Sequence, residues 1–375
     1  MKRRDALLGA VALGMAAALR GRESAAVVPV PDDCTAPPGY AGAAPTGIGA
    51  ASARELAGGA GEGRHFVDVE QGWTLTHDCL RAHRIGAPLV GTIDESSRAH
   101  GTAVLGIVCG TGAGYLGLAP QLASVHVSST SESLSSGIAA AIDKLLAINA
   151  ADRDSAGGVL LVETQAQLFT SEGAMGRLPA EALPELFDLI AGATRRGITV
   201  IEAAGNGSDT GGVPEGIDLD GFLDERGERF LRRDPHRDSG AIIVGAAHAR
   251  VVAGRHERFP SSNYGSRVDC YAWGEQVTAP ASSGCSADFG ETSAAAAIVA
   301  GVALIVQGVA AAARPGVRLP PLRLREILSH AELGTACVTA AGHIGVMPNL
   351  AKILQAGVLG VTPVRRNRFQ APAPG

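Results

Sequence analysis

An acid, a histidine, an asparagine and a serine occur in that order along the chain, each beside a predicted strand end or helix start. They are Glu70, His100, Asn206 and Ser293. A serine hydroxyl becomes a nucleophile when an imidazole removes its proton, and a carboxylate can fix the imidazole tautomer and stabilise its charged form. An asparagine amide can donate a hydrogen bond to the oxyanion that forms during acyl transfer. Together these residue types predict nucleophilic acyl transfer, provided that the fold brings them together.

The serine lies at the start of a long apolar segment. No charged residue occurs from Ser293 to Ala313, so the segment is long enough to cross a membrane. It consists mostly of Ala and Gly, and the polar residues Glu291 and Thr292 precede it, which favours a helix buried in the protein core. Because Thr and Ser also cap helices, Ser293 taken alone could be an ordinary cap.

Two acids compete for the position beside the histidine. Residues 65–70 alternate apolar and polar side chains, which predicts a strand on which Asp68 and Glu70 point to the same side. In an open α/β sheet, sites are built at the carboxyl ends of the strands. His100 precedes a run of small and apolar residues with helical spacing, so either acid could orient it.

Strands and helices alternate through the middle of the chain. Apolar runs predict buried strands at 158–162, 198–204 and 241–245, and periodic segments predict helices at 138–150, 179–196 and 322–328. This order predicts an α/β fold with a doubly wound, mostly parallel sheet and helices on both faces.

Composition limits the classes of partner. The chain has 375 residues, of which 46 % are hydrophobic and 50 are Gly, so it is long enough for a substantial core and is not of the disordered class. A net charge of -5 gives no electrostatic footprint for nucleic acid, and we expect a small molecule or a polypeptide as partner.

The six cysteines form no CxxC pair, so no metal site is predicted. Cys270 and Cys285 are the nearest pair in sequence, but disulfide pairing cannot be deduced from spacing, and several cysteines could equally be small buried hydrophobes.

The termini differ from the middle of the chain. Residues 1–26 have a basic start, an apolar run and small residues, which predicts a signal peptide, and Arg3-Arg4 resembles a twin-arginine export signal. An uncleaved or membrane-tethered N-terminus is the alternative. Residues 27–63 are rich in Pro, Gly and Ala and predict a linker or short pro-segment, followed by a domain at 64–360 and a tail at 361–375. We therefore expect export to the periplasm or the extracellular space.

Five short motifs together resemble those of the subtilisin-like serine peptidases, the subtilase family S8. Residues 100–106 (HGTAVLG) are similar to its HGTxVAG motif, and residues 292–295 (TSAA) lie where its GTSxAxP motif would. The others are AAGN at 203–206, GLAP at 117–120 and SNYG at 262–265. The resemblance spans about residues 45–355.

This resemblance implies a three-layer subtilisin-like fold and a serine endopeptidase that acts on polypeptides, with no nucleic-acid partner and no stable membrane span in the mature chain. It implies a monomer that needs no cofactor, with bound calcium expected from the family alone. By the matching motifs, Glu70, His100 and Ser293 would form the triad and Asn206 would donate to the oxyanion. A substrate strand would pair with an exposed edge near residues 157–165, which includes Gly158, Glu163 and Gln165.

Four departures from the family pattern bear on activity. Glu70-Gln71-Gly72 stands where an Asp-[Ser/Thr]-Gly turn is usual, and Glu163-Thr164-Gln165 replaces a Ser-Leu-Gly strand edge. Glu291 replaces a glycine, and Ala297 replaces a proline. A glutamate at 291 could crowd the site or alter its preference. The alternative function is therefore a catalytically weak or inactive subtilase-fold module that binds peptides.

Overall fold

The computed structural model describes residues 38–366, except for short gaps at 113, 152–157, 171–172, 210–213, 224–226, 228–230, 282–283, 317, 339 and 341. The predicted signal peptide at 1–26, residues 27–37 of the predicted linker and residues 367–375 of the tail lie outside this range.

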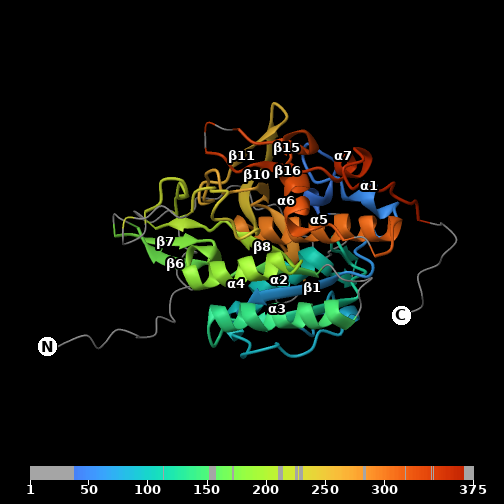
Figure 1. Ribbon diagram of the computed structural model, residues 1–375, viewed down its shortest axis with the longest axis horizontal. Helices are drawn as coiled ribbons and strands as arrows, with labels where there is room; N and C mark the ends of the chain where they lie inside the picture. Colours follow the sequence, from blue (N-terminus) through green and yellow to red (C-terminus); the bar gives the residue numbers. More distant parts are fainter. Residues whose placement is uncertain are drawn as a thin grey trace. The chain divides into compact units, whose positions relative to one another are not determined.

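The central sheet is nine-stranded and mostly parallel (Figure 1). Its strand order is β15-β16-β12-β10-β8-β5-β1-β4, and β11 pairs with β10. Only β15 and β11 run antiparallel to their neighbours. The strands are β1 His65–Glu70, β4 Ser124–Ser129, β5 Gly158–Val162, β8 Thr199–Ala203, β10 Ile242–Val252, β11 Arg255–Arg258, β12 Cys270–Trp273, β15 Gly334–Ala336 and β16 Val346–Pro348.

Three small antiparallel sheets surround it. They comprise β2 Thr111–Gly112 with β3 Tyr115–Leu116, β6 Ala166–Phe169 with β7 Met175–Leu178 and β9 Gly207–Ser208, and β13 Val277–Pro280 with β14 Cys285–Phe289. The α-helices are α1 Ala50–Arg54, α2 Arg98–Cys109, α3 Leu134–Ala151, α4 Pro184–Arg195, α5 Glu291–Ala313, α6 Pro321–Ser329 and α7 Leu350–Gln355. Single 3-10 turns occur at η1 Gly39–Ala41, η2 Arg81–His83, η3 Glu95–Ser97, η4 Ala180–Ala182 and η5 Ala331–Leu333.

Helices cover both faces of the central sheet. On β5, Gly158 faces α3 so closely that an added Cβ would lie 2.4 Å from the side chain of Leu145. The next residue, Val159, points to the opposite face and is in register with Thr199 of β8. Thr199 accepts a hydrogen bond of 2.8 Å from Gln307 of α5. Therefore α3 and α5 lie on opposite faces, and the predicted doubly wound α/β fold is confirmed.

The central helix α5 is a core helix. Within the described residues, α3 and α5 are both long and apolar enough to cross a membrane, but the apolar window of α5 is 100 % buried and that of α3 is 33 % buried. Small residues permit this enclosure, because a Cβ at Gly308 would lie 2.3 Å from the carbonyl oxygen of Gly58. The predicted buried helix at 293–313 is confirmed.

The prediction of a linker is wrong for residues 38–63. Tyr40, Ile48 and Ala53 are buried in the main core, and the indole of Trp273 donates a 2.7 Å hydrogen bond to the carbonyl of Thr46. A few apolar residues among many small ones suffice here, because the backbone itself packs closely. The start of the predicted tail is also bound, since the Ala57 N–H donates to the carbonyl of Val364 at 2.8 Å.

The cysteines divide between a disulfide and free thiols. Cys285 is disulfide-bonded, whereas Cys270 is a free, buried thiol, so these two sequence neighbours are not a pair. Cys79, Cys109 and Cys337 are also free and buried, as expected of small hydrophobic side chains.

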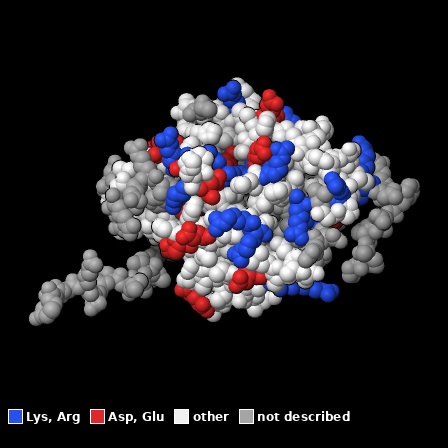
Figure 2. Space-filling view, viewed as in Figure 1, with Lys and Arg blue, Asp and Glu red and all other residues white. Residues whose placement is uncertain are grey.

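Surface charge is mixed. Figure 2 shows acidic and basic side chains in small groups of both signs on one face of the molecule.

Inside the protein, Arg267 forms a buried ion-pair cluster: its guanidinium contacts Glu181 at 2.7 Å and Asp269 at 2.9 Å. Both acids are almost fully buried. Glu181 depends on Arg267 for charge compensation, whereas Asp269 also pairs with Arg233 and Arg325.

Replacing Arg267 by Met should lower the free energy of unfolding by about 3–5 kcal/mol, because the buried Glu181 carboxylate would lose its ion-pair partner. Urea unfolding at pH 7 measures this. As a control, Arg250→Met removes an exposed partner of Glu257 and should leave the unfolding midpoint nearly unchanged. Equal effects of the two substitutions would contradict a structural role for the buried cluster.

Candidate active site

The four predicted residues lie at the carboxyl ends of strands or at the starts of helices. Glu70 ends β1, Asn206 follows β8, and His100 and Ser293 lie in the first turns of α2 and α5. Since β1, β5 and β8 are adjacent and parallel, their carboxyl ends share one edge of the sheet. His100 contacts Glu70, and Asn206 contacts Thr292, the neighbour of Ser293. The site therefore lies at the carboxyl edge, where α/β sheets build their sites.

Glu70 contacts the imidazole directly. Its Oε2 lies 2.5 Å from His100 Nδ1, and its Oε1 accepts a 2.8 Å hydrogen bond from the Gln71 N–H. The carboxylate is 7 % exposed and the imidazole 30 % exposed. Burial lowers the pKa of His100, but the negative charge of Glu70 and its hydrogen bond outweigh burial, and the net pKa is raised. Glu70 therefore stabilises the charged imidazolium.

Two glycines allow this approach of α2 to the turn after β1. A Cβ on Gly101 would lie 2.3 Å from the carbonyl oxygen of Gly72 and 2.6 Å from the Trp73 ring. Any larger residue at 101 would push the helix, and His100 with it, away from the strand.

Asp68 has a different partner. Its Oδ2 accepts a 2.7 Å hydrogen bond from the indole of Trp73, and the side chain is fully buried. Burial, and then the charge of Glu70, raise the pKa of Asp68 well above its ordinary value. Of the two acids weighed from the sequence, the geometry favours Glu70 as the partner of His100.

Ser293 lies beside a buried acid. The side chain of Glu163, at the end of β5, is 3 % exposed, and its pKa is raised well above 4.5 by burial and then by the charges of Asp68 and Glu70. The nearby Ser293 hydroxyl lowers this pKa, but by less than burial and the neighbouring charges raise it. In the described part of the chain, no hydrogen bond joins Ser293 to His100. To be deprotonated, the hydroxyl must come within hydrogen-bonding distance of the imidazole, a tightening that bound substrate can bring about.

Asn206 is held from three sides. Its backbone N–H donates to Gln165 Oε1 at 3.0 Å, and its side-chain Oδ1 accepts from the Thr292 N–H at 3.2 Å and from the Thr292 hydroxyl at 2.5 Å. Its Nδ2 donates to Glu291 Oε2 at 2.8 Å. The amide is thus fixed next to Ser293, and Glu291 engages one of the two N–H donors of Nδ2.

Only part of segment 157–165, the predicted substrate-binding strand edge, lies at the site. Gly158 is buried at the amino end of β5, and β5 pairs on both sides with β1 and β8. An exposed edge at this strand, and substrate contact at Gly158, are therefore contradicted, because Gly158 lies five residue steps from Glu163 along the strand, about 16 Å. Glu163 and Gln165 follow the strand and do lie at the site.

Some contacts could not be read from the sequence. The ring of Phe289 lies edge-on to His100 with 5.2 Å between centroids, and the Ser261 hydroxyl donates to Glu291 Oε1 at 3.2 Å. Phe289 precedes the Thr-Ser motif, but nothing in its spacing indicates contact with a residue almost 200 positions earlier. The Trp73 contact with Asp68 is likewise tertiary.

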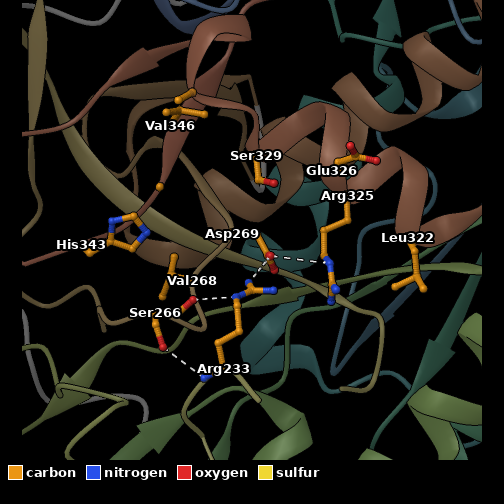
Figure 3. Close-up of a pocket in the computed structure, with 12 residues that line it drawn as sticks. Arg233, Ser266, Val268, Asp269, Leu322, Arg325, Glu326, Ser329, His343 and Val346 are labelled. Carbon is orange, nitrogen blue, oxygen red and sulfur yellow. Dashed lines mark hydrogen bonds and ion pairs between the residues drawn. The ribbon is translucent and has the colours of Figure 1, made fainter. Parts of the chain in front are cut away.

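A hollow of about 460 Å³ lies at the other end of the sheet (Figure 3). Its lining includes Asp269, just before β12, and Gly345, just before β16, so it opens at the amino ends of these strands. Arg233 and Arg325 point towards Asp269 and are ion-paired with it (Figure 3). Its charges compensate one another, and it is separate from His100 and Ser293.

The subtilase family model matches residues 83–346. The match includes His100, Asn206 and Ser293 and begins after Glu70. The chain therefore belongs to the subtilase family, and is a serine peptidase by that membership. A search of curated protein sequences finds no match.

Solved structures support the same fold. A cold adapted subtilisin-like serine proteinase is 22 % identical with a TM-score of 0.50, covering 78 % of this chain and 89 % of the other. The S41 psychrophilic protease is 19 % identical and sphericase 18 % identical, each with a TM-score of 0.53, covering 77 % of this chain and 92 % of the other. The expected three-layer subtilisin-like fold is confirmed.

The raised pKa values of Asp68 and Glu163 predict a pH effect on stability. Both acids keep a proton in the folded state that they lose when unfolded, so stability should fall as pH rises above about 4, by at most ~1.4 kcal/mol per pH unit for each group. Asp68→Asn and Glu163→Gln should each flatten the decline of unfolding free energy between pH 5 and pH 8, measured in urea.

The control for this prediction is Asp78→Asn, which removes an acid that is 68 % exposed. Its profile should follow that of the wild type. If the buried substitutions leave the profile unchanged as well, the two acids are ionised in the folded protein.

Proposed function

We propose that this protein is a serine endopeptidase in which Ser293 is the nucleophile, His100 the general base and Glu70 the residue that orients His100. The observation that carries the proposal is the 2.5 Å contact between Glu70 Oε2 and His100 Nδ1. The His100 ring in turn contacts Phe289, which shortly precedes the Thr-Ser motif. A proton on Nδ1, held by Glu70, leaves Nε2 free to accept the proton of the serine hydroxyl.

The reaction would follow two acyl-transfer steps. Ser293 attacks the peptide carbonyl while His100 takes its proton, and His100 then gives that proton to the leaving amine. Water then attacks the acyl-enzyme: His100 takes a proton from the water and returns it to the Ser293 oxygen as the carboxylic acid product leaves. The developing oxyanion would be bound by the Asn206 side chain and the backbone N–H of Ser293, the latter at a helix start where N–H groups have no partner within the helix.

The substrates proposed are polypeptides, bound in extended form near Glu163 and Gln165. We propose that the enzyme acts as a monomer and that the steps above need no cofactor; calcium remains a proposal from family resemblance. Subtilases are commonly secreted, which fits export directed by residues 1–26 to the periplasm or the extracellular space.

Endopeptidase activity is tested with a peptide that is acetylated at one end and amidated at the other, so that only internal bonds can be cut. The wild type should cleave it, and Ser293→Ala should lose on the order of 10⁴-fold or more in kcat while keeping its thermal unfolding midpoint. Mass spectrometry locates the cut. Undiminished hydrolysis by folded Ser293→Ala would refute the nucleophile.

The third member of the triad is tested in the same assay. Glu70→Gln should reduce kcat by a larger factor than Asp68→Asn, because only Glu70 contacts the imidazole. A greater loss with Asp68→Asn would reverse the assignment. Peptide binding without cleavage by folded wild type would favour the alternative, a peptide-binding module.

A further inference from the structure

The carboxylate of Glu291 lies where the oxyanion donor should be free. Glu291 Oε2 accepts the 2.8 Å hydrogen bond from Asn206 Nδ2, the group assigned above to the substrate oxyanion. A carboxylate is itself an anion, so it takes one N–H of Nδ2 and would repel a second negative charge bound to the same group. The family pattern has a glycine at this position, with no side chain to make such a contact.

The orientation of the Asn206 amide follows from its other contacts. The backbone N–H of Thr292 can only donate, so the Asn206 atom that faces it at 3.2 Å must be Oδ1. The Thr292 hydroxyl donates to the same oxygen. Nδ2 therefore lies on the other side of the amide, towards Glu291, and rotating the amide would break two hydrogen bonds to Thr292.

The backbone places Glu291 there at a cost. Its φ is 59°, in the left-handed region that disfavours residues with a Cβ by roughly 1–2 kcal/mol. Its N–H donates to the carbonyl of Gly274 at 2.7 Å, and a Cβ on the preceding Gly290 would lie 2.5 Å from that same oxygen. The backbone is thus held firmly, and only the side chain of Glu291 can move out of the site.

No ion pair among the described residues fixes the Glu291 carboxylate in this position. The Ser261 hydroxyl donates to its second oxygen at 3.2 Å, and the positive charges that face it are Arg177 and His100. Arg177 is already paired with Asp209 at 2.8 Å, and Asp209 opposes the ionised form of Glu291. The carboxylate is therefore bound by two neutral donors and by no ion pair of its own among the described residues.

Acid is an unsuitable release signal. Burial raises the pKa of Glu291 from its ordinary 4.5, but the pKa of His100 is also raised, from an ordinary 6.5. A pH low enough to neutralise Glu291 would also protonate the general base. Rotation of the side chain is the remaining route that leaves His100 active.

We infer that Glu291 is an internal inhibitor of the reaction: its carboxylate occupies the oxyanion donor of Asn206, and the site becomes catalytic only when this side chain rotates away. The inference rests on the proposed serine peptidase function. Loss of one oxyanion donor costs on the order of 100-fold to 1000-fold in kcat. Displacement of Glu291 by substrate therefore controls a large part of the attainable rate.

The test is the rate at which a fluorophosphonate labels Ser293, since its phosphoryl oxygen needs the same donors as a peptide oxyanion. Glu291→Gly should raise the second-order labelling rate by about 10-fold to 100-fold. The same substitution in an Asn206→Ala background should give no gain, because the donor that it would free is absent. Glu291→Asn, which tolerates a left-handed φ and has a shorter, uncharged side chain, should also label faster than the wild type.

Gln276→Gly is the matched control for backbone strain. Gln276 is exposed and has a φ of 53°, so its replacement relieves the same kind of strain without contacting Asn206. It should not change the labelling rate. A similar gain with Gln276→Gly, or a gain from Glu291→Gly that persists without Asn206, would overturn the inference.

The inhibitory role of Glu291 and the serine nucleophile can be refuted separately. If the wild type labels at Ser293 and Glu291→Gly and Glu291→Asn are no faster, the inhibitory role of Glu291 is refuted and the proposed peptidase stands. If no folded variant labels, the serine nucleophile is refuted and the inhibitory role falls with it.

Discussion

The contact between Glu70 and His100 is the constraint on which the rest of the site depends. It requires the last residue of β1 and the first turn of α2 to meet within hydrogen-bonding distance, and Gly72 and Gly101 provide the close backbone approach. A glutamate reaches one methylene further than the aspartate usual in this family, so the same contact with Nδ1 is possible from a turn of different sequence. Placing the imidazole in this way also fixes where a reactive serine must lie.

Three acids share the buried space behind the imidazole. Asp68, Glu70 and Glu163 affect one another electrostatically, and burial makes simultaneous ionisation costly. Glu70 has both the imidazole and the Gln71 N–H as partners. Burial raises the pKa values of Asp68 and Glu163, which favours their neutral forms, and Glu70 is the acid that contacts His100.

The sequence predicted the sheet and the central helix because each follows from local pattern, whereas the four candidate site residues were assigned from the family's motifs. Strand 65–70 alternates and ends in an acid, and 293–313 is a charge-free run of small residues. What the pattern could not predict are contacts between distant segments. The choice between Asp68 and Glu70 depends on Trp73 and His100, and the role of Glu291 depends on Asn206, 85 residues earlier.

The linker and the substrate edge were mispredicted for a related reason. The Pro, Gly and Ala content of 38–63 indicates flexibility only if no tertiary partner exists, whereas Trp273 and the core enclose this segment. Strand β5 was expected at an edge because a motif was assigned to it. The order of strands in a sheet, which places β5 between β1 and β8, is a property of the whole topology.

The most direct measurement of the central claim is the titration of His100 followed by ¹⁵N NMR of the imidazole in the wild type, Glu70→Gln and Asp68→Asn. The account predicts that Glu70→Gln lowers the pKa of His100 markedly and abolishes the preference for a proton on Nδ1, because the carboxylate that contacts this nitrogen is gone. Asp68→Asn should lower the pKa by much less. A pKa unaffected by Glu70→Gln, or lowered more by Asp68→Asn, would contradict the account.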